Sequence, residues 1–269
     1  MNNMDYMSRY GFEFNPYVKG INDSLIETSQ HREVITRLNY LSQVKGFGLI
    51  TGQPGMGKTT ALRTWKNNLN PAAYKVVYTS LSTITVLEFY RTLAEELGYE
   101  PAFRKNENFK IIHEGINRYV IEKRMTPVFI LDEANYMKSA TLNDLKILFN
   151  FEMDSVNKAV VILTGLPQLN NILRLSSHEP LAQRIIMNYE MEPLSIEEGI
   201  KFIQDKQKKA GSHMEVFERN ALEAIVTAST GIPRIIDKIS NQTLLIGNTL
   251  NENIITAETV MKAVNDIQI

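Results

Sequence analysis

The chain has 269 residues, of which 43% are hydrophobic and 22% are charged, and its formal net charge is −1. This is the balance of a folded globular protein, and a charge near zero gives no global attraction to nucleic acid or membrane. The absence of cysteine excludes disulfides, thiolate nucleophiles and cysteine-based zinc sites. No apolar run approaches the roughly 20 residues of a membrane-spanning helix, so we expect a cytoplasmic protein without a membrane partner.

The first two thirds of the chain alternate between apolar runs and amphipathic stretches. Strands are predicted at 47–51, 75–79, 127–131, 159–163 and 187–191. Helices are predicted at 58–69, 109–124 and 142–151, and another begins after Thr85, where Thr85 and Glu88 form a capping box. Gly98 ends that helix. The alternation predicts an α/β fold with a five-stranded parallel sheet covered by helices on both faces.

Beyond Pro193 the pattern becomes helical, with stretches at 195–210, 216–229, 233–246 and 257–266. Ser195 and Glu198 give the first of these stretches a capping box. We therefore predict an N-terminal segment at 1–25, an α/β core at 26–192 and a small all-helical lid domain at 193–269.

A glycine-rich motif lies between the first strand and the first helix. Its pattern, G-x-x-x-x-G-K-[ST], is matched by Gly52, Gln53, Pro54, Gly55, Met56, Gly57, Lys58 and Thr59, and Thr60 follows. Glycines let successive backbone N–H groups turn towards phosphates, and the helix directs its positive N-terminus at them. Lys58 is expected to reach the β- and γ-phosphates and Thr59 to ligate Mg²⁺. An accidental glycine-rich turn is the alternative; the strand–loop–helix order favours a P-loop that binds ATP with Mg²⁺.

An acidic pair, Asp132 and Glu133, ends the apolar strand at 127–131. Ligands of open α/β sheets bind at the carboxyl ends of the strands, so Asp132 is a candidate to hold Mg²⁺. Glu133 is a candidate general base for the attacking water. A solvated strand end is the alternative, but the P-loop upstream favours ATP hydrolysis. P-loop kinases remain open as a further alternative.

These motifs resemble those of AAA+ ATPases, and the resemblance covers nearly the whole chain. Asp132 and Glu133 resemble the Walker B pair, and Thr164, at the end of the fourth strand, resembles sensor 1. The segment Gly231-Ile232-Pro233-Arg234 resembles the sensor 2 signature, which implies that Arg234 reaches the γ-phosphate. The resemblance implies a P-loop NTPase AAA+ core followed by a helical lid.

The same resemblance assigns a role to Arg184, which precedes the fifth strand as the arginine finger does in initiator-like members. Arg174 is the substitute candidate. A finger that completes a neighbour's site implies a homo-oligomer with a head-to-tail interface, closed as a ring or continued as a helical filament.

More narrowly, the sequence resembles the ExeA/TnsC/MuB-like group of bacterial ATPases. Asn15, Pro16 and Tyr17 resemble the group's N-P-[FY] opening, which implies that they lie over the adenine. The segment at 164–169 resembles its G-Q-P-x-L turn, with Leu166 at the position of the glutamine. Arg184 and Arg234 also have a plainer interpretation as surface charges.

The group suggests two functions. One is a regulator of DNA transposition that oligomerises on double-stranded DNA with ATP and recruits a transposase; the other is an ExeA-like ATPase associated with secretion. Because the chain ends after the lid without a spanning helix or further domain, we favour transposition.

DNA contacts are expected at Ser82, Thr83, Arg104, Lys105 and Lys110. The segment 101–125 carries six basic and three acidic residues, and a solvated helix face is the alternative interpretation of these charges. A non-hydrolysing ATP switch or adaptor is the third possibility.

Overall fold

The computed structural model describes residues 5–18, 26–80 and 83–267, and the chain divides into two compact units. The core unit comprises Glu33–Pro54 and Lys58–Met191. The lid unit comprises Met1–Arg32, Gly55–Gly57 and Glu192–Ile269. The N-terminal segment therefore groups with the C-terminal helices, as does the tip of the glycine-rich loop.

The core unit is built on a sheet of five parallel strands in the order β2-β3-β4-β1-β5. Its strands are β1 Gly46–Thr51, β2 Tyr74–Thr79, β3 Thr126–Leu131, β4 Val160–Gly165 and β5 Ile185–Glu190. The central strands are buried along nearly their whole length, as the continuous apolar runs of the sequence require. The predicted five-stranded parallel sheet is confirmed.

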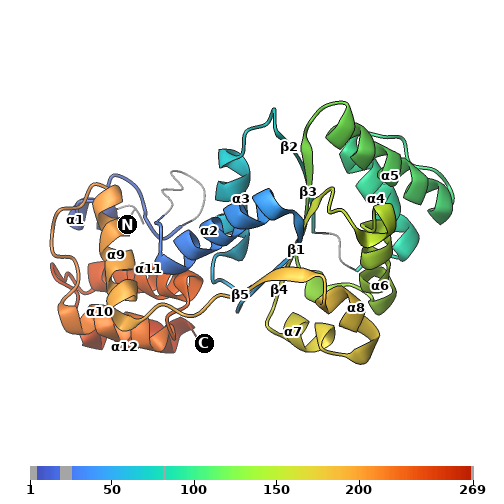
Figure 1. The fold of residues 1–269 in the computed structure, drawn as a ribbon. Helices are drawn as coiled ribbons and strands as arrows, with labels where there is room; N and C mark the ends of the chain where they lie inside the picture. Colours follow the sequence, from blue (N-terminus) through green and yellow to red (C-terminus); the bar gives the residue numbers. More distant parts are fainter. Residues whose placement is uncertain (1–4, 19–25, 81–82, 268–269) are drawn as a thin grey trace. The chain divides into compact units, whose positions relative to one another are not determined.

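Helices cover both faces of this sheet: α2 and α3 lie on one side, and α4 and α5 lie on the other (Figure 1). The helices are α2 Ser29–Val44, α3 Lys58–Asn68, α4 Val86–Leu97, α5 Lys105–Ile121 and α6 Ser139–Leu148, with the shorter α7 Gln168–Leu173 and α8 Glu179–Ala182. In β3, Phe129 and Leu131 join the hydrophobic cluster under α4, α5 and α6, and the alternate residues face the other way. The capping box of Thr85 and Glu88 is present at the start of α4, with Gly98 as its left-handed C-cap.

No helix is predicted before β1 from the sequence, yet α2 spans 16 residues there. Its buried apolar positions, Val34, Leu38 and Leu41, follow the helical spacing i, i+4, i+7 but stand among polar residues. The Trp65 indole N–H donates to the Asn39 side-chain oxygen over 2.9 Å, which ties α3 to this helix. Three buried apolar residues among polar ones give too weak a periodic pattern for this helix to be predicted from the sequence.

The lid unit is helical, as predicted, with one isolated β-bridge between Phe217 and Ile255. Its helices are α1 Asp5–Arg9, α9 Ile196–Lys209, α10 Arg219–Ala228, α11 Pro233–Thr249 and α12 Ala257–Ile267. The capping box of Ser195 and Glu198 is present at the start of α9. Helix α10 begins at Arg219 rather than at 216, because the bridge holds the preceding residues extended. Within 5–18, 26–80 and 83–267, no helix combines the length and apolar character needed to cross a bilayer.

Candidate nucleotide and metal site

The glycine-rich loop leaves β1 after Thr51 and enters α3 at Lys58. Gly55 and Gly57 have φ values of +86° and +96°, in the left-handed region that glycine tolerates best. At Gly55 a Cβ atom would also lie 2.7 Å from the Cβ of Arg234, so a side chain there meets a second obstacle. The loop therefore needs glycine at these positions, and it presents the N-terminus of α3 to a ligand.

Lys58 is buried, and its ammonium group lies against the loop itself. Its Nζ donates to the carbonyl oxygens of Gly52, over 2.7 Å, and Gln53, over 3.2 Å. Hydrogen bonds between two charged groups are stronger than those to a neutral carbonyl, so phosphate oxygens would be better partners for this ammonium. The arrangement keeps a positive charge within the loop.

The Asp132 carboxylate, 4% exposed at the end of β3, accepts hydrogen bonds from four groups. On Oδ2 it accepts from the Thr59 hydroxyl over 2.9 Å and from the Tyr78 hydroxyl over 3.0 Å. On Oδ1 it accepts from the Thr164 hydroxyl and, over 3.0 Å, from the Glu133 backbone N–H. A carboxylate has about four lone-pair positions, so this set of donors fixes its orientation.

The sheet topology explains why these donors converge. Strand β3 lies between β2 and β4, and all three run parallel, so their carboxyl ends meet at one edge. Tyr78 pairs with Ile130 in register, and Asp132 follows Ile130 by two residues, so both side chains lie on the same face. Thr164 is the residue before the end of β4, and Thr59 belongs to the first turn of α3.

The Tyr78 hydroxyl remains protonated around neutral pH. Burial, followed by the negative charge of Asp132, raises the pKa of Tyr78 to about 12, although a hydrogen bond with Ser80 acts in the opposite direction. A protonated phenol is a donor, which agrees with its position on the carboxylate.

The donor chemistry of Thr59 and Asp132 fits Mg²⁺. A hydroxyl and a carboxylate oxygen lie 2.9 Å apart, and Mg²⁺ takes oxygen ligands, using one or two carboxylates together with substrate phosphates. In the described part of the chain, no three His, Asp or Glu side chains gather into a metal site of their own. The residues therefore suit a cation that arrives with a nucleotide.

Glu133 adopts a left-handed backbone conformation with φ of +55°. Such a conformation is uncommon outside glycine and asparagine, and it often marks functional positions. The Glu133 carboxylate is partly exposed, and it makes no hydrogen bond or ion pair with any residue in the described ranges. It is therefore accessible to water beside the Asp132 carboxylate.

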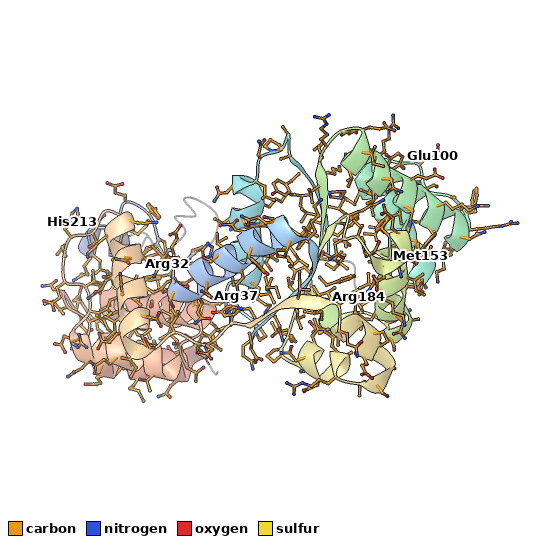
Figure 2. All side chains as sticks on the ribbon, in the orientation of Figure 1. Arg32, Arg37, Glu100, Met153, Arg184 and His213 are labelled. Carbon is orange, nitrogen blue, oxygen red and sulfur yellow. The ribbon has the colours of Figure 1, made fainter. Side chains whose placement is uncertain are left out.

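Arg184 lies at the opposite, amino-terminal edge of the sheet, directly before β5 (Figure 2). Its side chain is largely buried, forms an ion pair with Asp154 and donates to the Lys146 carbonyl oxygen over 2.6 Å. Burial lowers the pKa of Arg184 from its usual value. The structure thus places the predicted finger away from Asp132, whereas the substitute candidate Arg174 is exposed at the end of α7.

Asp154, the ion-pair partner of Arg184, lies in a turn with an unusual backbone conformation. Glu152, Met153 and Asp154 all have positive φ, between +51° and +68°, and Met153 is fully exposed (Figure 2). Three such residues in succession carry backbone strain that persists only where neighbours determine it. The ion pairs of Arg184 with Asp154 and of Lys158 with Glu152 hold the turn.

In the lid unit, Arg234 lies in the first turn of α11, after Pro233. Its backbone N–H donates to the Gly55 carbonyl oxygen over 3.3 Å, and its guanidinium is exposed. The predicted sensor 2 residue is therefore beside the tip of the glycine-rich loop. Its contact with a γ-phosphate stays a prediction.

The predicted adenine segment packs within the lid unit. Asn15 donates to the Tyr6 hydroxyl and the Asn241 oxygen, both over 2.7 Å. Tyr17 is buried, and its hydroxyl accepts from Gln207 over 3.2 Å. These contacts satisfy much of the polar capacity of Asn15 and Tyr17, and the roles of Asn15, Pro16 and Tyr17 at the adenine stay predictions.

The predicted DNA contacts differ in their surroundings. Ser82 lies outside the described residues. Thr83, Arg104 and Lys110 are exposed, whereas Lys105 forms an ion pair with Asp144. Any DNA contact by these residues stays a prediction.

Two asparagines that the sequence analysis missed brace the same edge of the sheet as Asp132. The Asn135 side-chain oxygen accepts from the Leu166 N–H over 2.9 Å, and Asn170 donates to the Thr51 hydroxyl over 3.0 Å. Tyr78 was missed as well. Its position one residue before the end of the neighbouring strand was the available signal.

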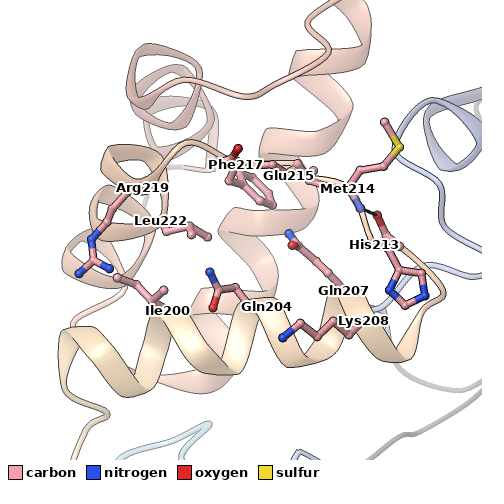
Figure 3. A pocket seen from close by; sticks show the side chains of 12 residues that line it. Ile200, Gln204, Gln207, Lys208, His213, Met214, Glu215, Phe217, Arg219 and Leu222 are labelled. Carbon is pink, nitrogen blue, oxygen red and sulfur yellow. Dashed lines mark hydrogen bonds between the residues drawn. The ribbon is translucent and has the colours of Figure 1, made fainter.

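A separate cavity of about 470 Å³ opens on the lid unit between α9 and the segment at 212–219 (Figure 3). It is lined by polar and apolar side chains, among them Gln204, Gln207 and Lys208 of α9. None of its lining residues belongs to the glycine-rich loop, so it is distinct from the candidate site.

Comparison with known proteins gives one family match. Residues 41–173 match the AAA domain family. The matched range includes the glycine-rich loop, Asp132, Glu133 and Thr164, and it ends before Arg184 and Arg234.

Two curated proteins match the chain at less than 30% identity. The chain is 28% identical over 245 residues to General secretion pathway protein A of Aeromonas hydrophila, which is 89% of this chain and 44% of that protein. It is 27% identical over 126 residues to ATP-dependent target DNA activator B of Escherichia phage Mu, which is 46% of this chain and 37% of that protein. The chain spans less than half the length of either relative.

Among solved structures, Cdc6p from Pyrobaculum aerophilum matches 92% of this chain and 69% of that chain, with a TM-score of 0.68 and 17% identity. A likeness at this identity concerns the fold. The predicted P-loop AAA+ fold is confirmed.

Proposed function

From its place in the AAA+ family of P-loop proteins, to which this chain belongs, we propose that it hydrolyses ATP to ADP and phosphate with Mg²⁺. The observation that carries this proposal is the convergence of Thr59, Tyr78 and Thr164 on Asp132, with Glu133 accessible beside it. A fold that only binds nucleotide has no need for a second carboxylate next to the metal ligand.

Each residue has a defined role in this proposal. The loop amides and Lys58 would hold the phosphates, and Thr59 and Asp132 would hold Mg²⁺, which would supply positive charge to neutralise the phosphates. Glu133 accepts a proton from the attacking water as general base. Thr164 orients Asp132, and Arg234, beside the loop tip, is proposed to contact the γ-phosphate.

Release of phosphate from ATP, measured with and without Mg²⁺, tests the hydrolysis directly. We expect turnover that requires Mg²⁺ and that falls in the Glu133→Gln variant while ATP binding persists. ATP binding without any phosphate release would instead favour the non-hydrolysing switch or adaptor.

Assembly into a head-to-tail oligomer is the second part of the proposal. Strands of six residues are about 20 Å long, so Arg184 at one edge of the sheet is too far from Asp132 at the other edge to act on its own site. Arg184 is therefore proposed to complete the site of a neighbouring subunit, in a ring or a helical filament.

DNA is the proposed partner of that assembly, in the regulation of transposition. This is supported by the relative whose name describes an ATP-dependent activator of target DNA, and by the exposed cations Arg104 and Lys110. A small local excess of charge binds DNA weakly in one subunit, but repetition along an oligomer multiplies it. A transposase is the proposed further partner.

A secretion-associated function is the second candidate, because the relative from a general secretion pathway matches 89% of this chain, against 46% for the target DNA activator. Electron microscopy of the protein with a non-hydrolysable ATP analogue and duplex DNA separates the two. Regular protein-coated DNA that dissociates as salt rises supports transposition, whereas bare DNA at low salt supports the secretion candidate.

A further inference from the structure

We propose that Tyr78 is a positioning residue for the metal: its hydroxyl holds the Asp132 carboxylate in the orientation that binds Mg²⁺. The inference rests on the proposed function of this site. It goes beyond it by assigning a role to a residue outside the glycine-rich loop and the acidic pair.

The end of β2 holds Asp132 in two ways. The Asp132 backbone N–H donates to the Thr79 carbonyl oxygen over 2.9 Å, and Asp132 Oδ2 accepts from the Tyr78 hydroxyl over 3.0 Å. Neighbouring residues of one strand thus fix both the main chain and the side chain of the metal ligand. The strand pairing between β2 and β3 sets both contacts.

The donors to the two oxygens of the Asp132 carboxylate have different roles, and this gives Tyr78 a role that no other donor shares. On Oδ2 the second donor is Thr59, whose hydroxyl is also the proposed metal ligand. Tyr78 is the donor to Oδ2 that is not itself a proposed metal ligand. On Oδ1, Thr164 and the Glu133 N–H remain when the Tyr78 hydroxyl is removed.

Without the Tyr78 hydroxyl, the carboxylate loses one of the two donors on Oδ2. The terminal torsion of an aspartate is broad, so the carboxylate gains rotational freedom and is less well oriented to hold a metal beside Thr59. Residues that orient metal ligands typically change metal affinity by about 10- to 100-fold when they are replaced.

Tyr78→Phe tests this role because it removes the hydroxyl and keeps the ring. The side chain is 37% exposed, so the substitution leaves packing almost unchanged. Tyr74→Phe is the matched control: Tyr74 begins the same strand, on the same face, and its hydroxyl bonds to no residue within 5–18, 26–80 or 83–267.

The measurement is phosphate release as a function of Mg²⁺ concentration at saturating ATP, with ATP affinity measured separately in EDTA. In Tyr78→Phe we expect the Mg²⁺ concentration for half-maximal rate to rise about tenfold or more. ATP affinity in EDTA and the rate at saturating Mg²⁺ should stay near those of the unaltered protein, and Tyr74→Phe should match that protein throughout.

A second comparison separates positioning from a general structural effect. In an Asp132→Asn background, adding Tyr78→Phe should change the Mg²⁺ dependence of ATP binding no further, because the group that Tyr78 orients is already altered. An unchanged Mg²⁺ dependence in Tyr78→Phe alone, or an equal loss in both backgrounds, would overturn the proposal. If the unaltered protein binds ATP without hydrolysing it, Mg²⁺-dependent binding decides the role of Tyr78 while the ATPase proposal fails.

Discussion

The two edges of the core sheet are formed by the same parallel strands, but their polar groups are organised differently. At the carboxyl edge, Thr59, Tyr78 and Thr164 converge from separate segments on the Asp132 carboxylate. At the amino edge, Arg184 is held by Asp154 and by a backbone carbonyl of α6. One edge collects donors around a negative group, and the other holds a cation.

This difference indicates which part of the chemistry one chain can supply. The carboxyl edge brings together Lys58, Asp132 and Glu133, which are the proposed phosphate contact, metal ligand and base, within the core unit. The cation at the amino edge lies about 20 Å away along the strands, and we propose that it acts on the site of another subunit. The following substitutions test this contrast, from the largest expected effect to the smallest.

Lys58→Ala should abolish function at the carboxyl edge. Loss of charge-assisted hydrogen bonds worth about 3 kcal/mol predicts ATP affinity lower by about 100-fold, measured by titration calorimetry. Lys66→Ala, which removes an exposed cation from the same helix, is the control and should bind ATP normally. Normal ATP affinity in Lys58→Ala would refute the assignment of the loop.

Glu133→Gln should lower turnover while sparing binding. Removal of a general base predicts a loss of about 10²- to 10⁴-fold in phosphate release, with the ATP-bound assembly accumulating. Glu95→Gln, on the exposed face of α4, is the matched control. Turnover equal to that of the unaltered protein would remove Glu133 from the mechanism.

Arg184→Ala should act at the amino edge and affect only assembled protein. The ATP affinity of the isolated subunit should be unchanged. The additional ATP turnover that appears when subunits assemble should fall by up to about 10³-fold. Mixing Arg184→Ala with Glu133→Gln subunits should restore activity, because an intact Arg184 then faces an intact Glu133 at some interfaces. No restored activity in such mixtures would contradict the trans arrangement.

Asp154→Asn should have the smallest effect. Asp154 is more than half exposed, so loss of its pair with Arg184 should lower the free energy of unfolding in urea by less than about 1 kcal/mol. The stimulated turnover should be equal to or above that of the unaltered protein, because Arg184 is less tightly held. A loss of turnover as large as that in Arg184→Ala would indicate that Arg184 acts through its pair with Asp154 in its own chain, and not on a neighbouring subunit.

The sequence specified the carboxyl edge better than the amino edge, for a physical reason. Strand periodicity and the glycine-rich motif identify the loop and Asp132, because each follows a buried strand, and the family resemblance adds Thr164. The contact of Tyr78 with Asp132 depends on the register between β2 and β3, which a single sequence does not display. The pairing of Arg184 with Asp154 depends on a turn of three left-handed residues that no local pattern signals.

Helix α2 shows the same limit, because its three buried apolar residues stand among polar ones. The two capping boxes, by contrast, were predicted correctly because they depend on residues only three positions apart. Local chemistry was therefore predictable, and chemistry assembled across strands was predictable only where a motif marked it.

The central claim is that Asp132 and the glycine-rich loop form one site for ATP and its metal. Calorimetric titration of ATP, in Mg²⁺ and in EDTA, into the unaltered protein and Asp132→Asn tests it most directly. We predict that Mg²⁺ strengthens ATP binding in the unaltered protein and that Asp132→Asn loses most of this gain. Equal gains in both proteins, or no ATP binding to the unaltered protein, would contradict it.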